Sequence, residues 1–405
     1  MVAFLGRFFK VDIRYVITQG SWLLSGQAVS NLASFFLVIA FGNLLPKETY
    51  GTYKYILSIS GIFMLASLSD MSTAIIKGVA DGYENMYKET IKTEIKWGLF
   101  GSLGSLLTSG YYFYHDNTLF GYAFIVTAIM IPFFDTSNTY SYILAGKKRF
   151  DIQSGFNIAA RIVSALVLIV TVFFTKNILL ILLAYYLPYI FIGFVIGPIA
   201  LSKLSLNDKY DPNIITYGKH LSFLSALSFG ISYLDSIIVF HFLGPVQLAI
   251  YSIAGAPAAR VQSLFSIIPE MALPKLAERT TEELKATVLQ KIFRAMILAF
   301  IIVGCYMLIV PFFFNFFLPK YTDSIPYAML IAIPLIWYPF VIISRILSAK
   351  GATKFLYKYN IIGSIVQLSL MPLMIYYFGL MGAVLGRIIM SIFGNSLMFY
   401  FFKKL

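Results

Sequence analysis

The sequence predicts an all-α polytopic membrane protein whose twelve transmembrane helices form two six-helix lobes around a central cavity. Three observations predict this class. Of the 405 residues, 59% are hydrophobic and only 12% are charged, whereas soluble domains contain about 25% charged residues. Apolar runs of about 20 residues, the length needed to cross a bilayer, recur along the chain. These runs lack the polar and apolar alternation of outer-membrane strands, which excludes a strand barrel.

Twelve candidate spans follow one another with short connections. Their approximate ranges are 21–44, 51–76, 97–114, 118–142, 153–174, 178–200, 219–243, 247–271, 292–315, 324–348, 359–378 and 381–402. The first twenty residues mix basic and aromatic side chains, which predicts an interfacial amphipathic segment and not a cleaved signal peptide. The expected lobes are residues 1–205, with spans 1 to 6, and residues 206–405, with spans 7 to 12.

The placement of lysine and arginine predicts the orientation. Of 31 such residues, 23 lie at the two termini and in the loops between spans 2–3, 4–5, 6–7, 8–9 and 10–11. Four lie near the opposite surface, so the positive-inside rule places both termini in the cytoplasm. Most of the net charge of +13 therefore belongs to a basic surface suited to anionic lipid, and nucleic acid is not an expected partner.

Two weak internal matches predict a duplicated architecture. Residues 143–158, ILAGKKRFDIQSGFNI, align without gaps on 346–361, ILSAKGATKFLYKYNI, at an offset of 203 with five identities. A second match pairs LLPKETYGTYKYI (44–56) with LGPVQLAIYSI (243–253). An offset of six spans gives two parallel repeats, an arrangement of secondary transporters that bind substrate at the repeat interface.

Four arginines lie within predicted spans, namely Arg161, Arg260, Arg345 and Arg387. Arg260 lies in the eighth span, about 15–20 Å from either surface, which is too deep for its side chain to reach water by snorkelling. It needs an acidic partner or a water-filled cavity. An anionic ligand in the cavity and a structural salt bridge are both open, and the guanidinium geometry suits phosphate oxygens.

The acidic residues of the spans also allow two interpretations. Asp135 and Arg161 each lie thirteen residues from the turn at Lys148, which predicts an ion pair between them or, alternatively, two cavity residues. Asp235 either binds a coupling proton or sodium ion or pairs with Arg387. Three further charged residues lie near the inner ends of the helices, where we expect them to take part in gating or to cap a helix. These are Asp70, Glu270 and Arg345.

Further polar residues have both a binding and a structural interpretation. Lys54 could hold substrate near the outer surface or extend its amine to the interface. Gln27 and Asn31 lie one turn apart, where they could contact sugar hydroxyls or a neighbouring helix. No catalytic constellation, metal-ligand spacing or large outer loop is present, so neither an enzyme nor a metal site is expected. The single Cys305 allows no intramolecular disulfide.

Several short motifs carry a resemblance to a known family. They are LLPKETYGTY after the first span, AGKKRF after the fourth, LDSIIVFHFLGPVQLAIY across the seventh and eighth, and LPKLAE at the end of the eighth. With twelve spans as six plus six, the chain resembles the Wzx-type oligosaccharide-lipid flippases of the multidrug/oligosaccharidyl-lipid/polysaccharide exporter (MOP) superfamily. The resemblance covers essentially the whole chain.

This resemblance implies a transporter of the bacterial cytoplasmic membrane. It would move undecaprenyl-pyrophosphate-linked oligosaccharide to the outer leaflet by alternating access, driven by an ion or the membrane potential. No cofactor is implied beyond a coupling Na⁺ or H⁺, and one copy of the chain would suffice. Contact with polysaccharide polymerase machinery is a further expectation. The alternatives are a multidrug exporter and a polyprenol-dependent glycosyltransferase or polymerase.

Each candidate residue takes one role under this interpretation. The residues expected to bind pyrophosphate are Arg260, Arg161, Arg387, Arg345 and Lys54. The residues expected to contact sugar or line the cavity are Gln27 and Asn31. The candidates for ion coupling or gating are Asp235, Asp135, Asp70 and Glu270.

Overall fold

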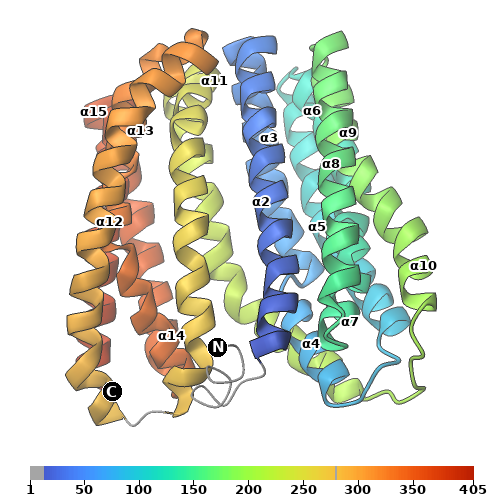
Figure 1. Ribbon diagram of the computed structural model, residues 1–405. Helices are drawn as coiled ribbons and strands as arrows, with labels where there is room; N and C mark the ends of the chain where they lie inside the picture. The colour runs from blue at the N-terminus through green and yellow to red at the C-terminus, as the bar shows by residue number, and fades with distance from the viewer. Residues whose placement is uncertain (1–12, 279–280) are drawn as a thin grey trace. The chain divides into compact units, whose positions relative to one another are not determined.

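The described part of the chain is helical throughout. The structure, a computed structural model, describes residues 13–278 and 281–405, and these form helices and short connections without strands (Figure 1). They divide into two compact units. Unit 1 contains the described residues up to Leu44 and Ile59–Ala226, and unit 2 contains Leu45–Ser58 and Leu227–Leu405. The start of the second span therefore belongs to unit 2, and the start of the seventh belongs to unit 1.

Unit 1 holds the first six spans apart from the start of the second. Its elements are α2 (Ile13–Leu44), the end of α3 (Lys47–Met64), η1 (Leu65–Ser67), α4 (Met71–Ala80), α5 (Tyr87–Tyr114), α6 (Thr118–Phe134), η2 (Thr136–Asn138), α7 (Thr139–Gly146), α8 (Phe150–Phe174), α9 (Ile178–Phe191), the π-helical turn η3 (Ile192–Ile196), α10 (Gly197–Ser202) and the start of α11.

Small side chains explain how α5 packs against α6. The buried face of α5 carries serine and glycine at helical spacing, which lets the two backbones approach closely. Ser102, Ser105 and Ser109 donate to backbone carbonyls of α6 at 2.6, 2.8 and 2.8 Å. These bonds satisfy hydroxyl groups where the bilayer core offers no water.

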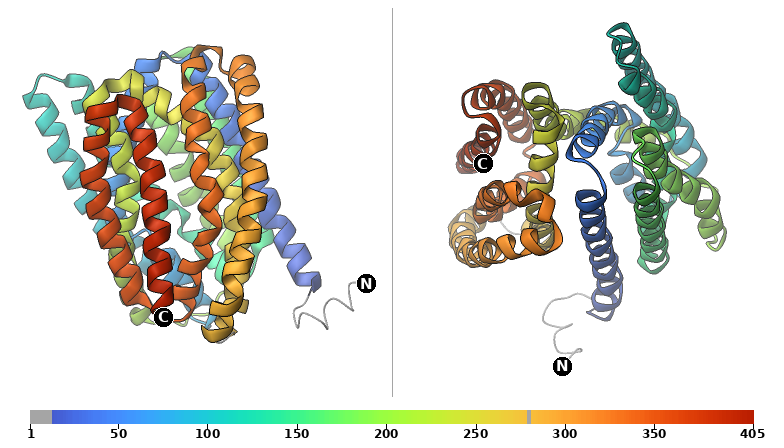
Figure 2. Two further views of the ribbon diagram at one scale, coloured as in Figure 1. Left: turned by 90° about the vertical axis from the view of Figure 1, so that its left-hand side faces the viewer. Right: turned by 90° about the horizontal axis from the view of Figure 1, so that it is seen from above.

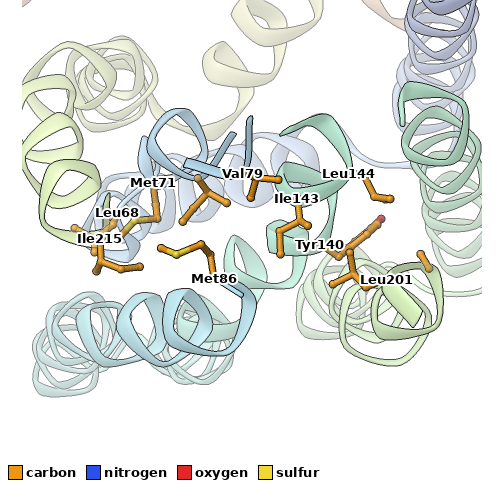
Figure 3. Packing of buried hydrophobic residues seen from close by; sticks show 11 residues of the cluster. Leu68, Met71, Val79, Met86, Tyr140, Ile143, Leu144, Leu201 and Ile215 are labelled. Atoms are coloured by element: carbon orange, nitrogen blue, oxygen red, sulfur yellow. The ribbon is translucent and has the colours of Figure 1, made fainter. Parts of the chain in front are cut away.

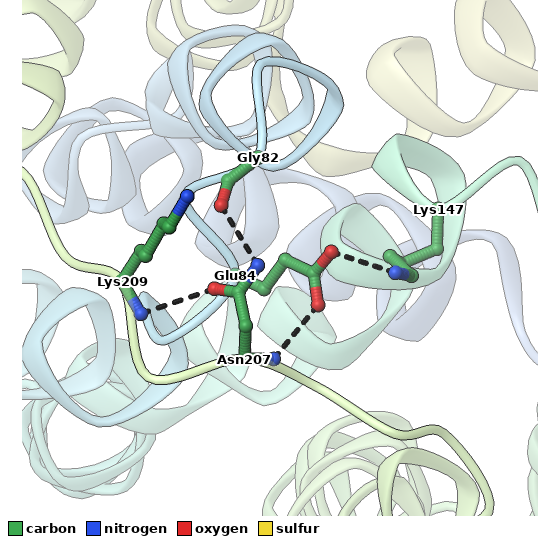
Figure 4. Close-up of polar contacts among 5 residues, drawn as sticks. All are labelled: Gly82, Glu84, Lys147, Asn207 and Lys209. Atoms are coloured by element: carbon green, nitrogen blue, oxygen red, sulfur yellow. Dashed lines mark hydrogen bonds and ion pairs between the residues drawn. The ribbon is translucent and has the colours of Figure 1, made fainter.

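One end of unit 1 is held by an apolar cluster and an ionic cluster. Met71, Ile75, Met86 and Ile143 are fully buried against one another (Figure 3). Beside them, the Glu84 carboxylate accepts a hydrogen bond from the Lys147 ammonium at 2.7 Å and another from the backbone N–H of Asn207 at 2.9 Å (Figure 4). The predicted basic loops after spans 2, 4 and 6 therefore meet at the same end of unit 1.

Unit 2 contains two long elements that each hold two spans. Its elements are the start of α3, most of α11 (Pro212–Glu278), α12 (Thr281–Phe317), η4 (Pro319–Ser324), α13 (Ile325–Ile331), η5 (Ile333–Phe340), α14 (Val341–Ala349) and α15 (Thr353–Lys403). The chain reverses within α11 at Gly244 and within α15 at Gly379, where φ is 82° and 56°.

Contacts across each bend demonstrate these reversals. Tyr251 lies 3.4 Å from Asp235, although sixteen residues of straight helix would separate them by about 24 Å. A Cβ on Gly382 would overlap the backbone of Met374, and Figure 2 shows the two arms of α15 side by side.

All twelve predicted spans lie on helices. Eight helices are long and apolar enough to cross a membrane, or nine if the bent pair Lys47–Ser67 and Met71–Ala80 is one span. Helices α11 and α15 are each counted once among these nine but contain two spans each, which gives eleven spans. The more charged helix α5 is one further span, so the described helices account for all twelve. The protein is a multi-pass membrane protein.

The predicted repeat is visible in one turn of each unit. Lys148 and Gly351, 203 residues apart, both have positive φ, 56° and 67°. At each turn the N–H of the next residue donates to a carbonyl five residues earlier, from Arg149 to Leu144 at 2.8 Å and from Ala352 to Leu347 at 2.9 Å. Leu144 and Leu347 are fully buried in their own units, so the matching sequence forms matching structure.

Candidate functional site

The structure brings two predicted cations together in unit 2. Lys54 on α3 lies close enough to Arg260 on α11 for their positive charges to repel each other. The Arg260 side chain is exposed, whereas Lys54 is half-buried, with its ammonium 5.9 Å from the centre of the Tyr50 ring. Two cations within electrostatic range of each other can both attract an anion with several oxygens.

Packing at the start of α3 positions Lys54. Gly51 has no side chain, and a Cβ there would overlap the carbonyl oxygen of Pro245, directly after the bend in α11. One turn later, the rings of Tyr55 and Phe240 stack with their centroids 3.8 Å apart. The two contacts hold α3 against the bend. This places the Lys54 amine near the second arm of α11.

A second cluster in unit 2 contains two more predicted residues. Gln367 donates to the Asp235 carboxylate at 2.7 Å, and the other Asp235 oxygen lies 3.4 Å from the Tyr251 hydroxyl. Arg387 hydrogen-bonds the same tyrosine and is attracted by Asp235. The Asp235 carboxylate is thus partnered through a network that includes Arg387. This agrees with the structural interpretation of the two residues.

Arg387 also lines a cavity of about 620 Å³ in unit 2. The other lining groups are mainly hydroxyls, amides and apolar side chains of α11, η5, α14 and α15. The cavity residues used below are Ser344, Asn360, Gly363, Gln367 and Arg387.

Unit 1 contains a cavity of about 480 Å³ lined by three predicted residues, Gln27, Asp135 and Arg161. The expected ion pair between Asp135 and Arg161 does not form. Arg161 instead donates to the Tyr189 hydroxyl at 3.2 Å and lies against the ring, 5.7 Å from its centre. Both residues line the cavity, which agrees with the alternative interpretation. The ion pair was not predictable because equal distance from a turn sets only the depth of a residue, whereas the rotation of each helix sets the direction of its side chain.

Of the other predicted residues with described side chains, Asn31, Asp70 and Arg345 do not line these two cavities. Gln27 donates to Asn31 at 3.3 Å, which confirms their shared helix face. Asp70 accepts a hydrogen bond from Ser225, and its backbone N–H donates to Ser222 at 3.2 Å, so it joins α4 to the start of α11. Arg345 lies half-buried on α14. Glu270 falls where the structure describes no side chains.

The sequence predictions missed Glu94. Its side chain is buried in unit 1 with 3% exposure, and its carboxylate interacts with a hydroxyl of Thr139, which donates at 2.8 Å. It was assigned to a basic loop because charged residues surround it. The sequence nevertheless contained a pattern that could have indicated its burial. The small-residue face of α5 continues toward the start of the helix in steps of four residues, through Gly98, Glu94 and Thr90.

Comparisons with known proteins define the class of this fold. A MATE-family multidrug transporter of the MOP superfamily in an inward-facing conformation superposes with a TM-score of 0.60 at 16% identity, covering 93% of this chain and 95% of that chain. The MATE transporter DinF-BH in complex with R6G gives 0.66 at 12% identity, covering 96% and 95%. A MOP-superfamily transporter from Pyrococcus furiosus, described as having a binding pocket of reversed polarity, gives 0.58 at 14%, covering 96% and 95%.

The fold is therefore the twelve-helix, two-lobe fold of the MOP-superfamily transporters, as the sequence predicted. The family profile of polysaccharide biosynthesis proteins matches residues 16–278, and the chain belongs to this family. No curated protein matches the chain.

Proposed function

We propose that this protein transports an undecaprenyl-diphosphate-linked oligosaccharide across the bacterial cytoplasmic membrane, from the inner to the outer leaflet, by alternating access. Both termini lie in the cytoplasm in this proposal. Membership of the polysaccharide biosynthesis family supports a glycan substrate, and the transporter fold supports movement rather than chemistry.

The juxtaposition of Lys54 and Arg260 carries this proposal. A lipid-linked sugar has a diphosphate between its prenyl tail and its glycan, so the part that resists crossing the bilayer is both anionic and rich in hydroxyls. Lys54 on α3 and Arg260 on α11, which lie within electrostatic range of each other, would neutralise the diphosphate. Hydrogen bonds to charged groups each contribute about 1.5–3 kcal/mol. Loss of either cation should therefore weaken binding by about tenfold or more.

Ion coupling forms a second part of the proposal. Asp135 lines the cavity of unit 1, and Asp235 lies beside the cavity residues Gln367 and Arg387 in unit 2. A carboxylate at such depth is costly unless a proton, a cation or a polar network satisfies it. Asp135 is the stronger candidate for a coupling H⁺ or Na⁺, since Asp235 has its own network. Asp70 and Glu270 remain gating candidates.

Multidrug export is the second candidate function, because the structural matches include multidrug transporters. The cationic pair favours the anionic lipid, since it would repel a cationic drug. A cationic dye and the lipid-linked sugar should therefore compete poorly for transport.

Transport by reconstituted protein tests the proposal. Proteoliposomes should move a fluorescent undecaprenyl-diphosphate sugar between leaflets. Arg260→Gln and Lys54→Gln should each lower the initial rate about tenfold or more, and Arg260→Glu should abolish transport. Lys176→Gln is the matched control, because Lys176 lies at the end of α8 and donates to its own helix at 2.6 Å. Wild-type transport by Arg260→Glu would refute the diphosphate site.

A further inference from the structure

The cavities of the two units occupy corresponding positions in the repeat. Asn157 lines the cavity of unit 1 and Asn360 lines that of unit 2, and they are identical residues 203 positions apart. The same offset relates Ser141 to Ser344. Asn157 donates to Ser141 at 3.5 Å, and Ser344 lines the unit 2 cavity with Asn360. The repeat therefore places an asparagine in the wall of each cavity, together with a serine that contacts the asparagine in unit 1 and lines the cavity in unit 2.

The charges of both cavities suit a diphosphate poorly. Among the described lining residues of unit 2, Arg387 is the only charged one, and its charge is already engaged by Tyr251 and Asp235. The unit 1 cavity has one acid and one base, Asp135 and Arg161.

A ligand of many hydroxyl groups fits these walls better. Amide side chains such as Asn157, Asn360 and Gln367 donate and accept hydrogen bonds at once, as adjacent hydroxyls on a sugar ring require. The phenol rings of Tyr185 and Tyr189 add an apolar face with a polar edge to the unit 1 cavity. The two volumes fall within the range of about 300–1,000 Å³ typical of small-ligand pockets, enough for a short glycan.

We propose that each unit has a saccharide-binding pocket, centred on Asn157 in unit 1 and on Asn360 in unit 2. The pockets hold sugar rings of the substrate and are separate in role from the cations Lys54 and Arg260, which hold its diphosphate. This inference rests on the proposed function, because it names the part of the same substrate that each group of residues recognises.

Two lipids that differ only in their sugar separate these roles. The purified full-length protein is titrated with undecaprenyl diphosphate and with the lipid-linked oligosaccharide extracted from membranes of cells that make the protein. Wild type should bind the glycosylated lipid more tightly. Asn157→Ala and Asn360→Ala should each weaken binding of that lipid about threefold to tenfold and leave undecaprenyl diphosphate unchanged. Asn315→Ala, an exposed asparagine of α12, is the matched control.

A steric variant provides a test that does not depend on deleting a hydrogen bond. Gly363 lines the unit 2 cavity, and a Cβ there would meet no atom within 4 Å. A larger side chain therefore has open space at its first atom, and Gly363→Leu should narrow the cavity. It should weaken binding of the glycosylated lipid alone.

The outcomes distinguish the two proposals. If the asparagine variants and Gly363→Leu weaken both lipids equally, or neither, the saccharide pockets are refuted. If Arg260→Gln leaves the binding of undecaprenyl diphosphate unchanged, the diphosphate site and hence the proposed function fail, whatever the asparagine variants do. Both proposals are supported if the pocket variants weaken binding of the glycosylated lipid alone and Arg260→Gln weakens binding of both lipids.

Discussion

The position of Lys54 depends on a glycine three residues earlier in the chain. Gly51 is the point where the backbone of α3 approaches Pro245, and no other residue type leaves room for that contact. Gly51 and Lys54 therefore act together. Close packing at Gly51 fixes the position of α3, and α3 directs the Lys54 ammonium group toward Arg260. A change at Gly51 should therefore affect both stability and transport.

Gly51→Ala should destabilise the protein and reduce transport. Overpacking of this kind costs about 1–3 kcal/mol, and relief of the overlap would move Lys54 away from Arg260. The apparent melting temperature in detergent and the initial transport rate measure the two effects. Gly110→Ala on α5 is the control, because a Cβ there meets nothing within 4 Å. Alanine in a helix is favoured over glycine by about 0.5–1 kcal/mol. Equal melting temperatures for the two variants would contradict this explanation.

Single-residue predictions from the sequence were correct where depth or helix face decided the answer. The shared face of Gln27 and Asn31 follows from their spacing along one helix. The network that joins Asp235 to Arg387 through Tyr251 agrees with one of the two interpretations that the sequence left open. Interactions that depend on helix rotation or on long-range packing were not predictable. The pairing of Asp135 with Arg161 was wrong for this reason, and the proximity of Lys54 to Arg260 was missed.

At the scale of elements, the connection between the two halves of the chain is fixed to unit 1. Besides bonding to Glu84, Asn207 donates from its side chain to the Gly82 carbonyl at 3.0 Å (Figure 4), and the Asn85 N–H donates to the Lys209 carbonyl at 3.1 Å. The start of α11 then packs on α4, since a Cβ on Gly218 would overlap Met71. The segment from Asn207 to Gly218 is therefore part of the packed structure of unit 1.

The Glu84 cluster should make stability depend on pH at low pH. The hydrogen bond from Lys147 holds the pKa of the Glu84 carboxyl below its ordinary value of 4.5, against the opposing effect of burial. Because the folded-state pKa is lowered, the stabilising contribution is complete above about pH 4.5 and is lost as the pH falls through the lower, folded-state value.

Glu84→Gln should accordingly destabilise the protein at pH 7 by about 1.5–3 kcal/mol, the range for hydrogen bonds to charged groups. The difference from wild type should shrink as the pH falls below 4.5. Thermal unfolding in detergent between pH 7 and pH 3 measures this. Glu89→Gln is the control, since its pair with Lys92 is exposed and should contribute less than about 1 kcal/mol. A difference that does not vary with pH would disprove the ionic explanation.

The elements themselves were largely predictable because span length and hydropathy are local properties. All twelve spans lie on helices, and the repeat at Lys148 and Gly351 was visible in the sequence. The breaks inside the membrane-spanning helices were harder to predict from the sequence. The bend between α3 and α4 and the π-helical turn η3 interrupt apolar runs without a charged loop to mark them. Hydropathy therefore finds the span and not the break within it.

At the scale of the whole molecule, loops on the same predicted side of the membrane contact one another within each unit. In unit 1 the basic loops after spans 2, 4 and 6 meet around Glu84. In unit 2 the short connections before α3 and after α12 meet in the ion pair of Lys47 with Asp323 at 3.1 Å. The positive-inside rule assigns the basic loops to the cytoplasm, so a cytoplasmic location of both termini is the orientation that we predict.

Cysteine labelling tests this orientation directly, because Cys305 is the only native cysteine. In a Cys305→Ser background, Lys320→Cys should react with a membrane-impermeant maleimide added to intact spheroplasts. Lys354→Cys should react only after the membrane is permeabilised. Both positions are exposed, so a failure to react cannot be attributed to burial. The reverse pattern would invert the orientation, and the cations of the loops would then face the wrong leaflet for a substrate assembled in the cytoplasm.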